Sequence, residues 1–328
     1  MAAKLSDVAK KAGVSVTTAS RVINNYGYLS EKTKNKVFAA MRELNYQPNS
    51  LARSLQGKKM KLVGLIFPSI THPLFAELIG VIEENLFRRG YKVILCNAGK
   101  DKDKEREYIK MLLANQVDGI ISGAHNLGIE EYKRTGLPIV AFDRKFSDQV
   151  PIVSCDNYQG IKLAVNELVK ANCKKIYFLG NKAQKGNPTD QRLDAYFDTT
   201  KELGLESHVC SVAFHDSALL KNMAIHNMLQ QDHPDGVVCS DDLSAILVLQ
   251  EAAKLGIKVP RDLKVIGFDG TKLIQTYHSE LSTIAQPIND IGTLLVKLII
   301  QRIEDPKAEL SQMHYTLPVK LIYSLSTE

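Results

Sequence analysis

Seven short apolar segments recur between residues 61 and 270, and longer stretches with helical spacing separate them. They are apolar on both faces, which is typical of strands in a parallel sheet that helices cover on both sides. Repeated strand and helix units of this kind predict an α/β body with parallel sheets. The segments lie at residues 62–67, 91–96, 117–122, 138–143, 175–180, 235–242 and 263–270.

Two of these segments resemble each other, VDGIIS at 117–122 and PDGVVCS at 234–240. A chain of 328 residues is also longer than one hydrophobic core usually organises. Both observations favour two similar open-sheet lobes, although a likeness this short also arises by chance.

Polar residues follow several of the predicted strands. Ligands of open parallel sheets bind beyond the carboxyl ends of the strands, so these residues mark a candidate site. Their hydroxyl, amide and charged groups suit a hydroxyl-rich ligand. They are Ser69, Asn97, Asp143, Arg144, Ser240, Asp241, Asp242 and Asp269.

The first 60 residues carry helical signals only. Ser6, Ser15 and Ser30 can each cap a helix, which predicts three helices that end near residues 12, 24 and 44. Gly13 permits a tight turn between the first two helices. The expected core of this small head is Ala9, Val14, Ala19, Val22, Ile23, Val37, Met41 and Leu44.

The positive charge of the chain is concentrated in this head. Residues 1–59 hold eleven Lys and Arg against three Asp and Glu, a net charge of +8, whereas the remaining residues carry −2. A basic head can neutralise phosphates and release counterions, which is the sequence-independent part of nucleic-acid affinity. Taken alone, such charge more often marks a solvated basic surface.

The strongest local signal is KLSDVAKKAGVSVTTASRVIN at residues 4–24. Its order of helix, glycine turn and second helix is that of a helix-turn-helix, whose second helix enters the major groove of DNA. Thr17 offers a hydroxyl and a methyl group to a base edge, and Arg21, one turn further on, can reach guanine O6 and N7. The spacing alone also fits a small helical domain with an exposed polar face.

Sequence motifs of catalysis are missing. We find no phosphate-binding glycine loop, nucleophile elbow or zinc-protease helix, and the eight histidines lack ligand spacing. Asp241 and Asp242 form a pair that acid–base chemistry could use, but Asp242 fits a helix cap better, and Asp241 can face the cleft. We therefore expect no catalytic residues, no metal site and no cofactor.

The five cysteines stand far apart, without a C-x-x-C pair, which favours reduced and buried thiols. The sequence shows no charged-then-apolar leader and no apolar run long enough to cross a bilayer. We expect a cytoplasmic protein with no membrane partner.

The helix-turn-helix segment resembles the heads of LacI/GalR transcriptional repressors, which carry D-V-A-x-x-A-G-V-S-x-x-T-x-S-R-V-[IL]-N. This chain departs from the family at Ala19, where valine is usual. The similarity continues through YLSEKTKNKV, ELNYQPNSLARSL, GLIFPSITHPLFAELI, VVCSDD, VIGFDG and STIAQP, so it covers nearly the whole chain. Residues 49–58 and 118–132 are most similar to sucrose-operon repressors of Gram-positive bacteria.

This resemblance implies a set of DNA contacts in the head. Val16 has no hydrogen-bonding group, so it can offer a base only apolar contact, for instance to a thymine methyl. The family's base contacts fall on Val16, Thr17 and Arg21, with Ser15, Ser20, Asn24 and Asn25 toward phosphates.

A short bridge at residues 48–61 follows the head, with a hinge helix expected at 50–56. So short a helix is unstable alone, so we expect it to be ordered only when DNA or a partner chain holds it. The resemblance places Ala52 and Arg53 at the minor groove and makes Leu55 the wedge between base pairs. Leu55 can also pack on a partner's hinge helix, which does not exclude the wedge.

The resemblance implies effector contacts in the sensor as well. The two aromatic rings would give flat apolar faces to a sugar, although core packing explains them equally well, and the charged groups would bind hydroxyls. The nearby stretch 182–189 departs from the family's patterns. The effector positions are Phe75, Asp143, Arg192, Phe214, Asp241, Asp269 and Gln286.

Three carboxylates against one guanidinium favour a neutral polyhydroxylated ligand over an apolar or a strongly anionic one. The resemblance narrows this ligand to sucrose, fructose or a close relative. A phosphorylated sugar is the alternative, because Lys182 and Lys185 lie near the rim.

The expected organisation is a helix-turn-helix head at 1–48, a hinge at 49–60 and a two-lobed, periplasmic-binding-protein-like sensor at 61–328. The lobes are expected at about 61–156 with 287–309, and at 157–286 with 310–328.

The expected function is repression of a carbohydrate operon by a homodimer on operator DNA, controlled allosterically by a sugar or sugar phosphate. The resemblance leaves open the direction of control and whether a phosphocarrier protein acts as co-regulator. The alternatives are a sugar-binding protein without DNA function, which the basic head opposes, and a sugar-metabolising enzyme, which the missing motifs oppose.

Overall fold

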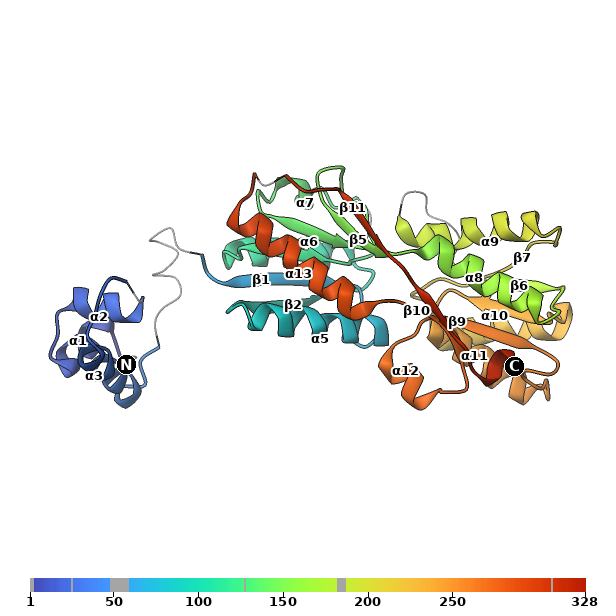
Figure 1. Cartoon of the computed structure of the whole chain (residues 1–328), viewed down its shortest axis with the longest axis horizontal. Helices are drawn as coiled ribbons and strands as arrows, with labels where there is room; N and C mark the ends of the chain where they lie inside the picture. The colour runs from blue at the N-terminus through green and yellow to red at the C-terminus, as the bar shows by residue number, and fades with distance from the viewer. Residues whose placement is uncertain (1–2, 25, 48–58, 127, 182–186, 308) are drawn as a thin grey trace. The chain divides into compact units, whose positions relative to one another are not determined.

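The computed structural model describes residues 3–24, 26–47, 59–126, 128–181, 187–307 and 309–328. The chain divides into two compact units, Met1–Met60 and Lys61–Glu328 (Figure 1). The expected hinge helix, including Ala52, Arg53 and Leu55, lies outside the described residues, as does Asn25.

The first unit contains the helices α1 (Leu5–Ala12), α2 (Val16–Ile23) and α3 (Glu31–Glu43). Gly13 ends α1 with a φ of 66°, and the Val14 amide donates to the Ala9 carbonyl, which closes the turn. The predicted core residues all pack together, joined by Val8, Ala12 and Ala40.

The predicted caps of this unit are partly correct. Ser15 Oγ accepts from the Thr18 amide at 3.0 Å, and Ser30 Oγ accepts from the Thr33 amide at 3.3 Å. Ser6 is not a cap, because α1 begins at Leu5 and the Asp7 carboxylate instead accepts from the Lys4 amide at 2.8 Å. An acidic residue in the first turn thus does the work expected of the serine.

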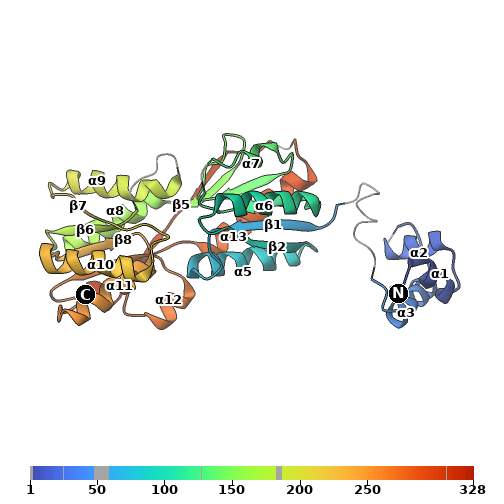
Figure 2. The same ribbon diagram turned by 180° about the vertical axis from the view of Figure 1, so that it is seen from behind.

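The second unit contains two six-stranded sheets, ordered β11-β5-β4-β3-β1-β2 and β12-β10-β9-β8-β6-β7. The strands pair in parallel except β12, which runs antiparallel to β10. Figures 1 and 2 show helices on the faces of both sheets. All seven strands expected from the sequence are present.

The first sheet consists of β1 (Leu62–Phe67), β2 (Lys92–Asn97), β3 (Gly119–Ser122), β4 (Ile139–Phe142), β5 (Ile152–Cys155) and β11 (His314–Leu317). The second consists of β6 (Ile176–Gly180), β7 (His208–Ser211), β8 (Gly236–Cys239), β9 (Lys264–Asp269), β10 (Ser282–Ala285) and β12 (Lys320–Ile322). The helices are α5 (Pro73–Phe87), α6 (Lys102–Ala114), α7 (Glu131–Arg134), α8 (Asn157–Lys170), α9 (Gln191–Glu202), α10 (Ala218–Asn227), α11 (Asp242–Lys254), α12 (Lys272–Tyr277) and α13 (Ile288–Glu304).

The two sheets repeat one topology. β3, from VDGIIS, and β8, from PDGVVCS, occupy the same place in their sheets, so the short sequence likeness reflects a real structural repeat. One boundary differs from the expectation. Residues 310–328 were assigned to the second lobe, but His314–Leu317 pairs with β5 in the first sheet. The alternating exposure of this edge strand gives no signal for which sheet it joins.

The described cysteines are all free, and Cys210 alone among them is half-buried rather than buried. In the part of the chain that the structure describes, no helix has the length and apolar character needed to span a bilayer.

Candidate functional site

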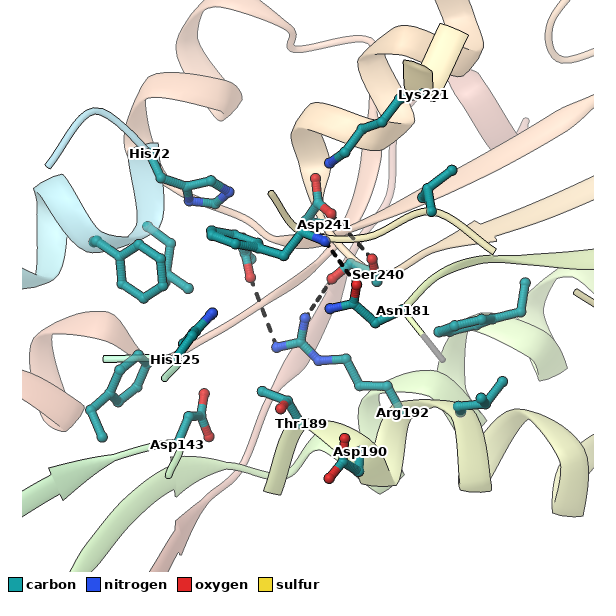
Figure 3. A pocket seen from close by; sticks show the side chains of 18 residues that line it. His72, His125, Asp143, Asn181, Thr189, Asp190, Arg192, Lys221, Ser240 and Asp241 are labelled. Atoms are coloured by element: carbon teal, nitrogen blue, oxygen red, sulfur yellow. Dashed lines mark hydrogen bonds and ion pairs between the residues drawn. The ribbon is translucent and has the colours of Figure 1, made fainter. Parts of the chain in front are cut away.

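A cleft in the second unit lies where strand ends of both sheets meet, and six of the seven effector positions expected from the sequence line it (Figure 3). Gln286 is not part of the lining, but its Nε2 donates to Asp269 Oδ1 at 2.8 Å and so holds that carboxylate. The six lining residues are Phe75, Asp143, Arg192, Phe214, Asp241 and Asp269.

Asp143 and Asp269 reach the cleft because β4 and β9 end there. Asn157 Nδ2 donates to Asp143 Oδ1 at 3.4 Å, so this carboxylate is only weakly paired. Burial raises the pKa of Asp143 to about 6, although the nearby Arg192 acts to lower it. Burial also raises the pKa of Asp269 well above its ordinary value, against the opposing charge of Arg192.

Arg192, near the start of α9, extends into the middle of the cleft (Figure 3). Its Nε donates to Asn157 Oδ1 at 2.6 Å, and Nη1 donates to the Ser240 carbonyl. The guanidinium carbon lies 3.7 Å from the centre of the Phe268 ring, and Nη2 lies 4.0 Å from Asp269 Oδ1. This buried cation is therefore held rigidly before any ligand arrives, which suits planar hydrogen bonding to hydroxyls.

Asp241 caps α11 and lines the cleft at the same time. Its Oδ1 accepts from the Ser244 amide at 2.7 Å, and its Oδ2 accepts from Ser244 Oγ at 2.9 Å. Burial acts to raise the pKa of Asp241, but the Lys221 charge and the Ser244 bonds outweigh it and lower the pKa. The lowered pKa keeps the Asp241 carboxylate ionised near pH 7.

The expectation that Asp242 caps this helix is wrong. Asp242 is buried beneath the cleft, where its Oδ1 accepts from Thr283 Oγ1 at 2.5 Å and its Oδ2 from the Gly270 amide at 2.8 Å. It ties β9 and β10 to α11. Burial raises the pKa of Asp242 to about 7.

Aromatic rings form one wall of the cleft. The ring centroids of Phe75 and Phe214 lie 6.0 Å apart, and those of His125 and Phe214 lie 4.9 Å apart. Phe75 is 3% exposed and packs against Phe67, so it belongs to the core and lines the cleft as well.

His72 and His125 also line the cleft, and no pattern in the sequence marks them as site residues. Burial lowers the pKa of His72, and burial together with the Arg144 charge lowers the pKa of His125 well below its ordinary value. Both imidazoles are therefore neutral near pH 7. His72 Nδ1 is buried and has no hydrogen-bond partner among the described residues.

Other lining residues were also missed by the sequence reading, and Figure 3 shows several of them around Arg192. Lys221 on α10 donates from Nζ to Ser244 Oγ at 3.3 Å and is 8% exposed. Strand-end polarity, the signal that marks Ser240 in the sequence, also applies to Asn181, which directly follows β6. The missed polar residues are His72, His125, Asn181, Thr189, Asp190 and Lys221.

The head exposes the start of α2, where DNA contacts were expected. Ser15, Val16, Thr17 and Arg21 are exposed, and Val16 retains 48% of its accessible surface. Arg21 folds back on its own turn, with Nε donating to the Tyr26 carbonyl at 3.4 Å. Because that bond is long and exposed, the side chain can leave it at little cost.

Ser20 and Asn24 lie further along the same helix and are half-buried. Asn24 Nδ2 donates to the Ser20 carbonyl at 2.9 Å and caps the end of α2. Any phosphate contact of Ser20 or Asn24 must therefore use hydrogen-bonding groups that take no part in this bond between the two residues.

Comparison with known proteins assigns both units to a family. Residues 4–49 match the family described as bacterial regulatory proteins, lacI family, and residues 165–327 match the periplasmic binding protein-like domain. A sucrose operon repressor of Pediococcus pentosaceus is 56% identical over 322 residues, 98% of each chain. The chain belongs to the LacI family of bacterial regulatory proteins. Its identification as a regulator and not an enzyme is thereby confirmed.

Solved structures of LacI family members share the fold. The lac repressor dimer bound to operator and the anti-inducer ONPF matches with a TM-score of 0.85 and 25% identity, over 100% of this chain and 99% of that one. A LacI regulator from Alkaliphilus metalliredigens, complexed with D-xylulofuranose, has a TM-score of 0.73 and 29% identity, over 82% of this chain and 99% of that one. The expected α/β architecture with a helical head and a two-lobed sensor is confirmed.

Proposed function

We propose that this chain represses a sucrose-utilisation operon, binding operator DNA through α2 and a neutral sugar, sucrose or fructose, in the cleft. The observation that carries the proposal is the cleft itself, where Asp143, Asp241 and Asp269 surround Arg192 beside the Phe75 and Phe214 rings. The sucrose repressor from Pediococcus, similar over the whole chain, supports the choice of operon.

The cleft chemistry matches a polyhydroxylated ring. Carboxylates accept from sugar hydroxyls, the guanidinium donates to sugar oxygens, and an aromatic face covers the C–H side of the ring. His72 Nδ1, buried without a partner among the described residues, offers a further polar contact. An unmet buried polar group costs free energy that a ligand hydroxyl would recover.

The dimensions of the cleft connect ligand binding to conformational change. Its volume is about 100 Å³, below the range of roughly 300–1,000 Å³ that small-molecule sites occupy. A sugar therefore requires the two lobes, or the His125 and Phe214 rings, to move apart. The lac repressor, similar over the whole chain, is bound to its operator as a dimer. We propose that this chain also forms a homodimer, and that the motion alters the dimer and so changes DNA affinity.

On the DNA side, we propose that Val16, Thr17 and Arg21 contact base edges, with Ser15, Ser20, Asn24 and Asn25 toward phosphates. Exposure of the first turn of α2 supports the base contacts. Such a regulator acts where the chromosome is, so a cytoplasmic location is part of the proposal.

The test is equilibrium binding of the full-length protein to labelled DNA from its own promoter and to a scrambled duplex. We expect tighter binding to the promoter, weaker binding as salt rises, and a change in promoter affinity when sucrose or fructose is added. Equal affinity for both duplexes would contradict the operator role. Promoter binding that no sugar alters would contradict the effector assignment while leaving the DNA role intact.

A further inference from the structure

A second pocket, of about 350 Å³, opens at the mouth of the cleft, and we call it the rim pocket. It shares His125, Asn181, Thr189, Asp190 and Phe214 with the cleft, so the two spaces adjoin. Once the cleft has opened to admit a sugar ring, a substituent on that ring can extend into the rim pocket.

The rim pocket differs from the cleft in its charge. Lys100, Lys102 and Arg144 line it, whereas its acidic member is Asp190, which the cleft shares. The cleft beyond carries three more carboxylates. The combined space is thus acidic inside and basic at its mouth, an arrangement that complements a neutral ring with an anionic substituent.

The cationic groups come from separate segments, and two of them, Lys100 and Arg144, act on His215. Lys100 follows β2, Lys102 begins α6 and Arg144 follows β4. Burial, then the charges of Lys100 and Arg144, lower the pKa of His215, so its imidazole is neutral and can donate one hydrogen bond.

Arg144 is fixed in place. Its Nε donates to the Ala124 carbonyl at 3.2 Å and its Nη2 to the His125 carbonyl at 2.7 Å, and it is 8% exposed. Lys100 and Lys102 are exposed and can adjust. One preorganised guanidinium with two adaptable ammonium groups is a donor set that suits phosphate oxygens.

We propose that the rim pocket binds the phosphoryl group of a phosphorylated sugar whose ring occupies the cleft. The inference rests on the proposed function, in that it takes the cleft as the site of the neutral sugar ring, and it deepens that function by adding a phosphate monoester on the ring, held outside the cleft.

The experiment is calorimetry of the full-length protein at constant ionic strength with fructose, sucrose and their monophosphates. The variant is the double change Lys100→Gln and Lys102→Gln, which leaves the loop-bracing Arg144 intact. The matched control is Lys104→Gln, an exposed lysine of α6 that lies outside the pocket. A further arm adds inorganic phosphate to the neutral sugars.

We expect a monophosphate to bind roughly tenfold or more tightly than its parent sugar, as one or two charge-assisted hydrogen bonds would give. The double variant should lose that advantage and keep its affinity for the parent sugar, whereas the control should keep both.

Three results would overturn the proposal. Equal affinity of parent sugar and monophosphate refutes the subsite but leaves the proposed function standing. If inorganic phosphate raises the affinity for a neutral sugar to that of the monophosphate, the pocket does not require a phosphoryl group that is bonded to the sugar. No heat with any sugar, while promoter DNA is still bound, refutes the sugar assignment together with the subsite.

Discussion

Asp143 and Asp269 occupy matching positions in the two sheets: each follows a phenylalanine at the carboxyl end of the third strand in its sheet. Both backbones have positive φ, 52° and 113°, and both side chains are buried. Such conformations are unfavourable for residues with a side chain and persist where the surrounding fold enforces them, typically at functional sites. The repeat thus directs one carboxylate from each lobe into the same cleft.

The change Asp269→Asn should weaken sugar binding by about tenfold or more, because an amide nitrogen replaces one carboxyl oxygen at the cleft while the shape is kept. Promoter affinity without sugar should stay near that of the unchanged protein. Calorimetry and promoter titration measure the two quantities. The control is Asp290→Asn, an exposed residue of α13, and equal effects of the two changes would place the sugar elsewhere.

Sugar affinity should depend on the protonation of Asp143, whose pKa burial raises to about 6. Since the carboxylate accepts from hydroxyls, affinity should fall as pH drops from 7 to 5. Asp143→Asn should remove this dependence, and calorimetry across that range tests it. If the affinity of the variant still falls between pH 7 and pH 5 as in the unchanged protein, a group other than Asp143 causes the pH dependence.

The same raised pKa makes an opposite contribution to the stability of the free protein. The folded state holds the Asp143 proton more tightly than the unfolded chain, whose pKa is near the ordinary 3.8. This contribution to stability is therefore complete below about pH 4 and is lost as pH rises through about 6. Urea unfolding of the protein and of Asp143→Asn, compared across that range, should show the difference.

Arg21→Ala should reduce discrimination between promoter and scrambled DNA by roughly 1 to 3 kcal/mol, the value of one bidentate base contact. Sugar binding should not change, since Arg21 lies in the other unit. Arg42→Ala, an exposed arginine at the end of α3, serves as control. A similar loss of affinity on both duplexes would reassign Arg21 to phosphate contact.

Gly270→Ala should destabilise the second unit more than Gly256→Ala. Both glycines have left-handed φ, 59° and 73°, so each change carries a backbone cost of about 1 kcal/mol. A Cβ at Gly270 would also lie 2.6 Å from the Ala285 Cα, whereas one at Gly256 meets nothing within 4 Å. Thermal unfolding of both variants tests this, and equal melting temperatures would show that the β9–β10 connection can shift.

Local patterns in the sequence determined much of this protein. Apolar segments with two covered faces marked β1, β3, β4, β8 and their neighbours, because burial on both sides leaves that pattern in any parallel strand. Gly13 and Ser15 marked the helix-turn-helix, since caps and turns depend on a few adjacent residues. Strand-end polarity located Asp143 and Asp269.

Only the tertiary structure decided what joins these residues in the cleft. His72, His125 and Lys221 come from segments far apart in the chain, and their meeting depends on strand order and on how the lobes face each other. Asp241 faces the cleft and also caps α11, the role expected of Asp242, for a similar reason: adjacent residues at a strand end point opposite ways, and the side that holds the cleft is set by the packing of α11 against β9. Periodicity reports which faces are buried, but it carries no information about which distant groups are buried together.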